Sequence, residues 1–247
     1  MSYVSEVLAD SPLLYWRFGE GSGLTAADTS GNGRTGTYSG AGITYGATGA
    51  LGASGDTNTA VTTVSASSGH IDSTASLDLS ALSVISVECW MKTTFTAGDN
   101  MLTEFSVVNW SIENGTFVID PNAGSDFQIG MRSAGQRLDS FTPRPSNGVY
   151  HHYVFVLNIG TGDITAYVDS VSQSLTVTGS ATSGTFGNIV LRVASRAGTS
   201  LFLDATLDEY AIYGSALSQA RVSAHYNAAL TNPTANLAPV IYGRGAC

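Results

Sequence analysis

The sequence predicts an all-β protein, a two-sheet antiparallel β-sandwich with one short helix near the N-terminus and one near the C-terminus. Strand-sized apolar runs separated by turn residues occur along nearly the whole chain, and helical periodicity is almost absent between them. Charged residues make up only 12% of the 247 residues, so Ser, Thr, Asn and Gly must form most of the surface. Such a surface, with 28 glycines for tight turns, favours strands over helices.

The N-terminal segment has helical spacing over a few residues only. Val4 and Val7 can share one face of a short helix, which must end before Pro12. Residues 13–18 then form the first predicted strand. Residues 19–69 are rich in Gly, Asn, Ser and Thr, and they predict loops and short strands.

The central part of the chain predicts one long strand and two hairpins. Within residues 77–91, Val87, Cys89 and Met91 occupy alternate positions, as in a strand with one face in the core, and we expect Cys89 to be a small buried residue. The hairpins are predicted from residues 107–112 and 116–119, joined at Asn114-Gly115, and from residues 150–157 and 164–168, joined by a turn-rich segment.

The last part of the domain predicts three further strands, at residues 189–193, 201–203 and 207–213. A helix follows, with Ser218 as its N-cap. Its apolar face comprises Val222, His225, Tyr226 and Ala229. Residues 231–247 contain two prolines and no periodicity, so we expect one domain over residues 1–230 and an extended tail that joins the chain into a homo-oligomer.

The charge balance excludes two classes of partner. Ten Lys plus Arg face nineteen Asp plus Glu, a formal charge of −9, and Lys92 is the only lysine. Nucleic acid and anionic membrane surfaces would be repelled, whereas a divalent cation would be attracted. We expect no membrane insertion, because no run approaches about 20 apolar residues. No secretory signal is visible at residues 1–8.

Catalytic patterns are missing from the sequence. Retaining glycoside hydrolases need two carboxylates about 5–5.5 Å apart, which alternate residues of a strand can supply. Asp208 and Glu209 are adjacent, so a regular strand would direct them to opposite faces. The pair His151-His152 should diverge in the same way, one ring buried and one exposed. There is no Gly-x-Ser-x-Gly motif either, and we expect no enzyme.

Several segments, in order along the chain, resemble one known family. They are Tyr15-Trp16-Arg17-Phe18-Gly19-Glu20-Gly21, Ala27-Asp28-Thr29-Ser30-Gly31-Asn32-Gly33, Tyr150-His151-His152-Tyr153, Tyr167-Val168-Asp169 and Leu207-Asp208-Glu209-Tyr210 with its following helix. The chain resembles the laminin-G-like jelly roll of the concanavalin-A-like lectin/glucanase superfamily, in its bacterial and phage form, over about residues 13–230. Residues 98–144 are the least similar part, and loop-borne specificity is expected there.

The resemblance implies a structural calcium site. In relatives, a loop after the first strand and an acid near the last strand can share Ca²⁺, and Asp28, Asn32 and Asp208 occupy matching positions. Calcium takes six to eight oxygen ligands, and a Gly-rich loop can turn its carbonyls inward. The alternative is that Asp28 and Asn32 only cap turns and that Asp208 pairs with an arginine.

The resemblance also implies carbohydrate binding, through aromatic rings that stack on sugars. Trp110, Tyr45 and Phe141 lie near predicted loops and are the candidates, with a place in the core as the alternative for each. The expected function is a non-enzymatic virion component of a bacteriophage, either a minor tail or a capsid decoration protein. Its partners would be other virion proteins and a cell-surface glycan, and it would be extracellular after lysis. A carbohydrate-binding module or a glycoside hydrolase of the same fold is the alternative.

Overall fold

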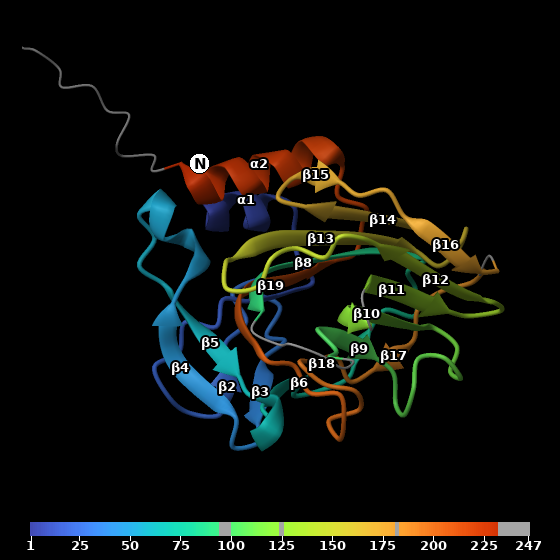
Figure 1. Ribbon diagram of the computed structural model, residues 1–247, viewed down its shortest axis with the longest axis horizontal. Coiled ribbons are helices and arrows are strands. Elements are labelled where there is room, and N and C mark those ends of the chain that lie inside the picture. The colour runs from blue at the N-terminus through green and yellow to red at the C-terminus, as the bar shows by residue number, and fades with distance from the viewer. Residues whose placement is uncertain (94–99, 124–125, 181–182, 232–247) are drawn as a thin grey trace, which may run out of the picture.

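The computed structural model describes residues 1–93, 100–123, 126–180 and 183–231. Two large antiparallel sheets pack face to face, and both α-helices lie on the outer side of one of them (Figure 1). This arrangement confirms the predicted all-β sandwich with one helix near the N-terminus and one late in the chain. The helical elements are α1 (Tyr3–Ala9), α2 (Gln219–Leu230) and two short 3-10 helices, η1 (Ala50–Ser54) and η2 (Ser65–Ser67).

The sheet beneath the helices has eight strands, and the other has nine. The eight-stranded sheet runs β15 (Val171–Ser172), β14 (Asp163–Val168), β13 (His151–Asn158), β8 (Val84–Thr93), β19 (Ala205–Tyr213), β5 (Thr59–Thr63) and β4 (Ile43–Thr48), with β1 (Leu14–Trp16) beside β19. The nine-stranded sheet runs β16 (Thr176–Gly179), β12 (Gln136–Phe141), β11 (Asp126–Arg132), β10 (Thr116–Ala123), β9 (Thr103–Phe105), β18 (Arg192–Val193), β6 (His70–Ser73), β3 (Gly36–Ser39) and β2 (Thr25–Ala26). A small pair joins β17 (Asn188–Ile189) to β7 (Leu77–Asp78).

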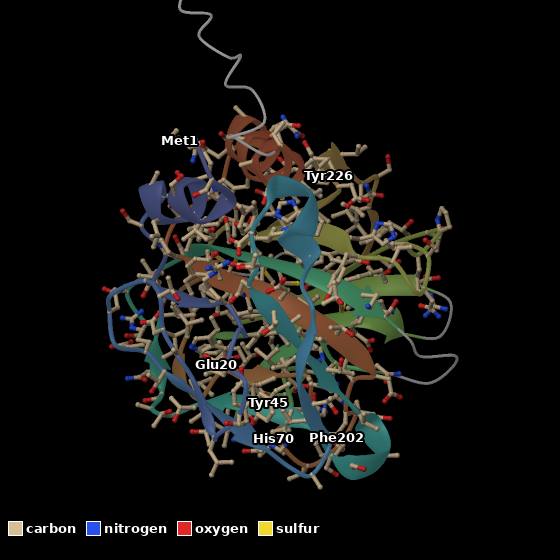
Figure 2. All side chains as sticks on the ribbon, turned by 90° about the vertical axis from the view of Figure 1, so that its left-hand side faces the viewer. Met1, Glu20, Tyr45, His70, Phe202 and Tyr226 are labelled. Carbon is tan, nitrogen blue, oxygen red and sulfur yellow. The ribbon has the colours of Figure 1, made fainter. Side chains whose placement is uncertain are left out.

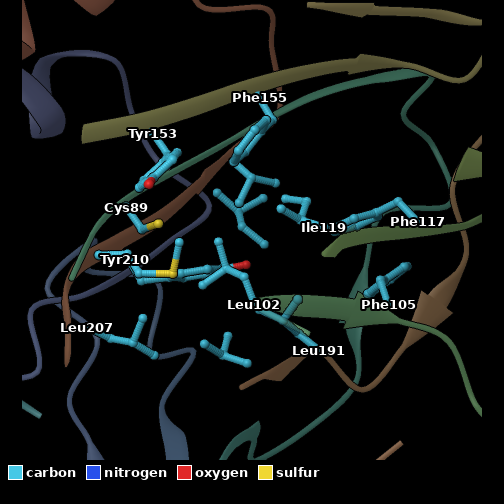
Figure 3. Packing of buried hydrophobic residues seen from close by; sticks show 14 of the residues in the cluster. Cys89, Leu102, Phe105, Phe117, Ile119, Tyr153, Phe155, Leu191, Leu207 and Tyr210 are labelled. Atoms are coloured by element: carbon cyan, nitrogen blue, oxygen red, sulfur yellow. The ribbon is translucent and has the colours of Figure 1, made fainter. Parts of the chain in front are cut away.

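Apolar side chains from both inner faces fill the space between the sheets (Figure 3). Val87, Cys89 and Met91 of β8 all point into this core, as their alternation predicted. From the nine-stranded sheet, the rings of Phe105 and Phe117 stack with their centroids 5.2 Å apart. Removal of these side chains from water is the main favourable contribution to folding, and the alternate residues are left to face outward.

Local sequence signals account for most of the elements. Ser2 caps α1, and Ser218 caps α2 by accepting from the backbone N–H of Arg221. The hairpin predicted from residues 150–157 and 164–168 is confirmed as β13 and β14.

The hairpin predicted around Asn114-Gly115 is right in its second strand and wrong in its first: residues 116–119 lie in β10, which pairs with β9, but residues 107–112 form no strand. Val107 and Val108 belong to a loop between β9 and β10, and their side chains are exposed. The Glu113 carboxylate accepts from their backbone N–H groups at 2.7 and 2.6 Å, so a side chain satisfies donors that a strand partner would otherwise take. Residues 201–203, also predicted as a strand, are irregular.

A buried carboxylate joins both helices to the sheet. Glu88 of β8 is fully buried and accepts hydrogen bonds from the Tyr3 hydroxyl of α1 at 2.8 Å and the Tyr213 hydroxyl of β19 at 2.5 Å. It also contacts Nε2 of His152 on β13 at 2.7 Å and Nδ1 of His225 on α2 at 3.0 Å. Strands β8, β13 and β19 and both α-helices therefore contribute to one polar centre within an apolar layer.

The two adjacent histidines separate as predicted. His152 is fully buried in the Glu88 centre, whereas His151 is 18% exposed and has its Nδ1 2.6 Å from Oδ2 of Asp169. A strand directs successive side chains to opposite sides, so the rings have different partners.

A bulge in β19 overturns the expectation for Asp208 and Glu209. The pairing of β19 with β8 shifts register between Asp208 and Ala211, and Glu209 has a φ of +53°, in the left-handed region. Leu207 and Tyr210 both point into the core, so both acids lie on the outer side of the sheet. The extra residue cancels the alternation on which the prediction rested, and the two carboxyl groups become buried neighbours.

Residues 232–247 lie outside the described part of the chain, and with them nearly all of the predicted tail and its role in oligomers. Among the described helices, none combines the length and apolar character needed to cross a membrane.

Candidate functional site

The outer face of the nine-stranded sheet carries a hollow around Trp110. Val118 of β10, Gly130 of β11 and Leu138 of β12 form a row across three paired strands. The Trp110 ring lies over Gly130, where a side-chain Cβ would come within 2.6 Å of ring carbons. Glycine is thus required at residue 130, because only a missing side chain leaves room for the indole on the sheet.

A second row, one step farther along the strands, is polar. Asp120 of β10 lies opposite Gln128 of β11, which lies opposite Ser140 of β12. Asp120, Gln128 and Trp110 line the same hollow of 120 Å³, and Arg196 lies at its side. In the part of the chain that the structure describes, the Gln128 side-chain amide has no hydrogen-bond partner. The hollow therefore combines a largely buried indole, 7% exposed, with a carboxylate, an amide that has no partner among the described residues, and a guanidinium.

Buried hydrogen bonds hold the Trp110 loop in place. The fully buried Glu104 carboxylate accepts from the backbone N–H of Trp110 at 2.9 Å and from Nε of Arg196 at 2.7 Å. The Thr116 hydroxyl donates to the Trp110 carbonyl at 2.8 Å. The indole and the guanidinium are therefore set in position before any ligand arrives, which lowers the entropy cost of binding.

The indole and polar groups of this hollow are better suited to binding a sugar than to catalysing a reaction. Sugar rings present apolar C–H faces and a rim of hydroxyls, which pair with an aromatic side chain and with planar polar groups respectively. Glu104, which holds the loop in place, is fully buried and already accepts from Ser106, Trp110 and Arg196.

A larger hollow of 340 Å³ lies at the end of the sandwich. Three prolines line it together with Arg144, Thr93 and Asn147. Thr93 donates to Asn147 at 2.6 Å, so these polar groups satisfy each other. We take the Trp110 hollow as the candidate site, because it is lined by an amide that has no partner among the described residues.

The other two aromatic candidates lie elsewhere. Phe141 is 3% exposed and stacks on Phe127 in the core at 4.8 Å, so it has no ring face for a sugar. Tyr45 on β4 contacts the Tyr38 ring edge-on and donates to the Gly23 carbonyl. Figure 2 shows Tyr45 at the end of the molecule opposite to Tyr226 of α2. The three predicted rings do not form one platform.

Asp28 acts as a cap for its own loop. Its Oδ1 accepts from the backbone N–H groups of Tyr15 and Ser30, and its Oδ2 accepts from the Ser30 hydroxyl and the N–H of Arg34. Asn32 donates its amide to the carbonyls that precede β1. Both residues thus have the turn-forming contacts of the alternative interpretation. No described group of three or more His, Cys, Asp and Glu side chains is placed to hold a metal.

Asp208, the third predicted calcium ligand, has other contacts. Its Oδ2 accepts from the Ala50 N–H of η1 at 2.8 Å, and its Oδ1 is buried without a partner in the described residues. Burial, and next the charge of Glu209, raise the pKa of Asp208 well above its ordinary value. Burial likewise raises the pKa of Glu209 to about 7, although Arg17 and Tyr15 lower it. Arg17 binds Glu209 at 2.7 Å and Asp56 at 2.8 Å.

The calcium prediction has a direct test in thermal melting. A ligand that binds only the folded chain stabilises it by mass action, so a chelator would lower Tm if calcium were bound. Added Ca²⁺ would then restore Tm. A chain in which Asp28 serves only as a loop cap melts at the same temperature with and without chelator.

The sequence proposed Trp110 as a candidate but gave no indication of the polar side chains that line the same hollow. Asp120 and Gln128 alternate with buried residues along their strands, which could have placed each on an outer face. Their side-by-side position depends on the register of β10 and β11, and a sequence does not display register. Arg196 comes from a loop after β18, far away in the chain.

Comparisons with known proteins agree with this architecture. A family model described as the concanavalin A-like lectin/glucanases superfamily, of the laminin G type, matches residues 65–223, more than half of the chain. Comparison with curated proteins gives no match. Domain 4 of AbnA, an extracellular GH43 arabinanase from Geobacillus stearothermophilus determined in complex with arabinotriose, is 16% identical with a TM-score of 0.62, covering 87% of this chain and 98% of that domain.

Two toxin domains have the same fold. The binding domain of Paraclostridial Mosquitocidal Protein 1 has a TM-score of 0.68 at 14% identity, covering 89% of this chain and 52% of that one. The botulinum neurotoxin serotype G binding domain has a TM-score of 0.62 at 10% identity, covering 87% and 50%. This chain thus spans about half of each toxin domain, and at these identities the likeness concerns the fold. Together with the sandwich topology, the family match shows that this chain belongs to the concanavalin A-like lectin/glucanase superfamily.

Proposed function

We propose that the protein is a non-enzymatic module that binds an oligosaccharide in the Trp110 hollow. The observation that carries this proposal is the indole beside the polar row of Asp120, Gln128 and Ser140, with the Gln128 amide unpaired in the described structure. A partly buried amide with no partner among the described residues can donate to and accept from the hydroxyl groups of a ligand. The arabinanase domain of similar fold, determined in complex with arabinotriose, supports a short sugar chain as the ligand class.

Replacing Gln128 by alanine is expected to weaken binding of an arabino-oligosaccharide roughly tenfold, because one or two hydrogen bonds worth about 1 kcal/mol each are lost. Isothermal titration of the full chain with arabinotriose and longer oligomers measures this change. Gln173→Ala is the matched control, since Gln173 follows β15 of the other sheet. The control should bind as the unchanged protein does.

Two outcomes would contradict the proposed site. Equal affinities of the Gln128→Ala variant and the unchanged chain would place binding elsewhere on the molecule. Absence of binding to a panel of neutral and acidic oligosaccharides would contradict a sugar ligand altogether. Trp110 is the least buried of the three tryptophans, so a change in its fluorescence on sugar binding gives a second readout.

The proposal that the protein is not an enzyme rests on the burial and hydrogen bonding of its acidic side chains. Glu104 is fully buried and accepts three hydrogen bonds, and Asp208 and Glu209 are fully buried beside η1 and Arg17. A sugar chain in the hollow would therefore meet Asp120 as its nearest acid. Release of reducing ends from any bound oligosaccharide, lost on Asp120→Asn, would contradict this view.

The setting that we propose for this binding is adhesion of a bacteriophage particle to a host-surface glycan. Its support is the sequence resemblance to phage proteins of this fold. A tail or capsid location stays a prediction. Export as a carbohydrate-binding module of an enzyme is the alternative setting, and the same hollow would then hold the same class of ligand.

A further inference from the structure

Three side chains at one end of the sandwich form a series of contacts that the sugar site does not include. The hydroxyl oxygen of Ser146, in the loop before β13, lies 3.4 Å from Nε2 of His151, the first residue of β13. Nδ1 of the same ring lies 2.6 Å from Oδ2 of Asp169, in the turn between β14 and β15. A hydroxyl, an imidazole and a carboxylate in this order are the arrangement that activates a serine as a nucleophile. The contact of the hydroxyl is long, as such contacts often are before a substrate binds.

The carboxylate of Asp169 sets the orientation of the imidazole. An ionised carboxylate only accepts hydrogen bonds, so in the neutral ring of His151 the hydrogen is on Nδ1 and Nε2 presents a lone pair to Ser146. Oδ1 of Asp169 accepts from the backbone N–H of His152 at 2.9 Å, and the Asp169 N–H donates to the His152 carbonyl at 2.8 Å. Burial alone would raise the pKa of Asp169, but the hydrogen bonds from His151 and His152 lower it below its ordinary value. The carboxylate is therefore fixed in place and ionised.

Ser146 lies at the border of the hollow of 340 Å³. Its chain neighbours Pro145 and Asn147 both line this hollow, together with Tyr153. Tyr153 follows His151 by two positions on the same face of β13, and the two rings meet edge-on with their centroids 6.2 Å apart. The serine is exposed, so a reagent in solution can reach its hydroxyl. A hollow of this size, lined by three prolines and two aromatic rings, can hold the acyl group of a small ester.

We propose that Ser146 is a nucleophile that accepts an acyl group from an activated ester or thioester. The Ser146 oxygen attacks the carbonyl carbon of the acyl donor while Nε2 of His151 takes the hydroxyl proton. The bond from this carbon to the alcohol or thiol then breaks, and His151 gives the proton to the departing alcohol or thiol. Asp169 orients the ring and stabilises the imidazolium that exists between the two steps. The product is an ester on Ser146.

This reaction is a modification of the protein, separate from sugar binding in the Trp110 hollow. An ester of a serine is a poorer acyl donor than the activated ester that forms it, because an alkoxide is a poorer leaving group than a thiolate or a phenolate. The acyl group therefore accumulates on the chain, up to one per molecule. Either proposal can fail without the other.

Acetylation of the full chain by p-nitrophenyl acetate tests this proposal. We expect a burst of nitrophenolate that approaches one equivalent per chain, and mass mapping of peptides should place the acetyl group on Ser146. Ser146→Ala should remove the burst. Ser172→Ala, which replaces an exposed serine on β15, is the matched control and should keep it. Absence of a burst from the unchanged chain, or acetylation of a different residue, would overturn the proposal.

Variants of the other two side chains test the activation of the serine. His151→Gln should slow acetylation of Ser146 about 100-fold or more, the usual contribution of a general base. Asp169→Asn keeps an oxygen that can accept from the His152 N–H, so it should slow acetylation while the melting temperature stays close to that of the unchanged chain. Circular dichroism verifies the fold of both variants. Equal rates of acetylation in His151→Gln and in the unchanged chain would show that Ser146 reacts as an ordinary hydroxyl, and would overturn the proposal.

Discussion

Replacing Glu88 by alanine is expected to lower the free energy of unfolding by about 3–5 kcal/mol. The carboxylate is fully buried and is the common partner of Tyr3, His152, Tyr213 and His225. Its removal leaves two hydroxyls and the His152 imidazole without a partner in an apolar layer, whereas His225 keeps Asp10 at 2.9 Å. Each such group costs about 1–3 kcal/mol if it stays unsatisfied. Urea unfolding measures the loss. Asp163→Ala, an exposed carboxylate on β14, is the control and should change stability little.

The same centre makes stability depend on pH. Burial alone would raise the pKa of Glu88, but His225 and His152 hold it well below its ordinary value, so its contribution is present above about pH 4.5 and is lost in acid. Burial alone would lower the pKa of His225, but Glu88 and Asp10 raise it above 6.5, so its contribution is complete below that pH and is lost as pH rises. The Glu88 centre therefore contributes most to stability between about pH 4.5 and pH 6.5.

The fall in the free energy of unfolding at alkaline pH should be smaller for His225→Gln than for the unchanged protein. An alanine variant of Glu88 that is as stable as the unchanged protein would show that the helices are held by apolar contacts alone.

Replacing Arg17 by methionine is expected to lower the free energy of unfolding by about 3 kcal/mol at neutral pH. Arg17 binds the fully buried Glu209 with two guanidinium nitrogens, at 2.9 and 2.7 Å, and methionine keeps most of the aliphatic stem without the charge. Glu209 and its neighbour Asp208 would then share a buried site with no counter-charge. Arg34→Met is a control on an arginine whose guanidinium reaches a backbone carbonyl.

The loss of stability caused by Arg17→Met should increase with pH. The pKa values of Asp208 and Glu209 are raised in the folded chain, so their contribution is complete below the ordinary carboxyl pKa and falls as pH rises through about 7. Without Arg17 the carboxylates are still harder to ionise, and the difference between variant and unchanged protein should be larger at pH 9 than at pH 5. A constant difference across this range would contradict the role of Arg17 as the counter-ion of Glu209.

The features that can be predicted well from the sequence are local. The alternation of Val87, Cys89 and Met91 assigns one face of β8 to the core, since strand geometry alone decides it. The cap at Ser218 and the apolar spacing after it define α2 within one turn of chain. The divergence of His151 and His152 follows from the same two-residue period.

Predictions from sequence patterns fail where a side-chain hydrogen bond or an extra residue changes the backbone conformation. Glu113 accepts from the N–H groups of Val107 and Val108, and the strand expected at residues 107–112 becomes a loop. The bulge at Glu209 adds one residue to β19 and brings two acids to one face. Such competition between local hydrogen bonds and sheet pairing is settled by the whole structure, because each alternative satisfies the same backbone groups.

The sequence by itself determined the fold class and the core faces of the long strands, because these depend on composition and on the two-residue period of a strand. It determined the family through the resemblance of particular segments, such as Leu207-Asp208-Glu209-Tyr210. Only the tertiary structure decided the site. Trp110 can lie on Gly130, and Gln128 beside Asp120, only after the register of β10, β11 and β12 has been set. Register depends on the packing of every strand at once, and a shift by one residue would exchange the inner and outer faces.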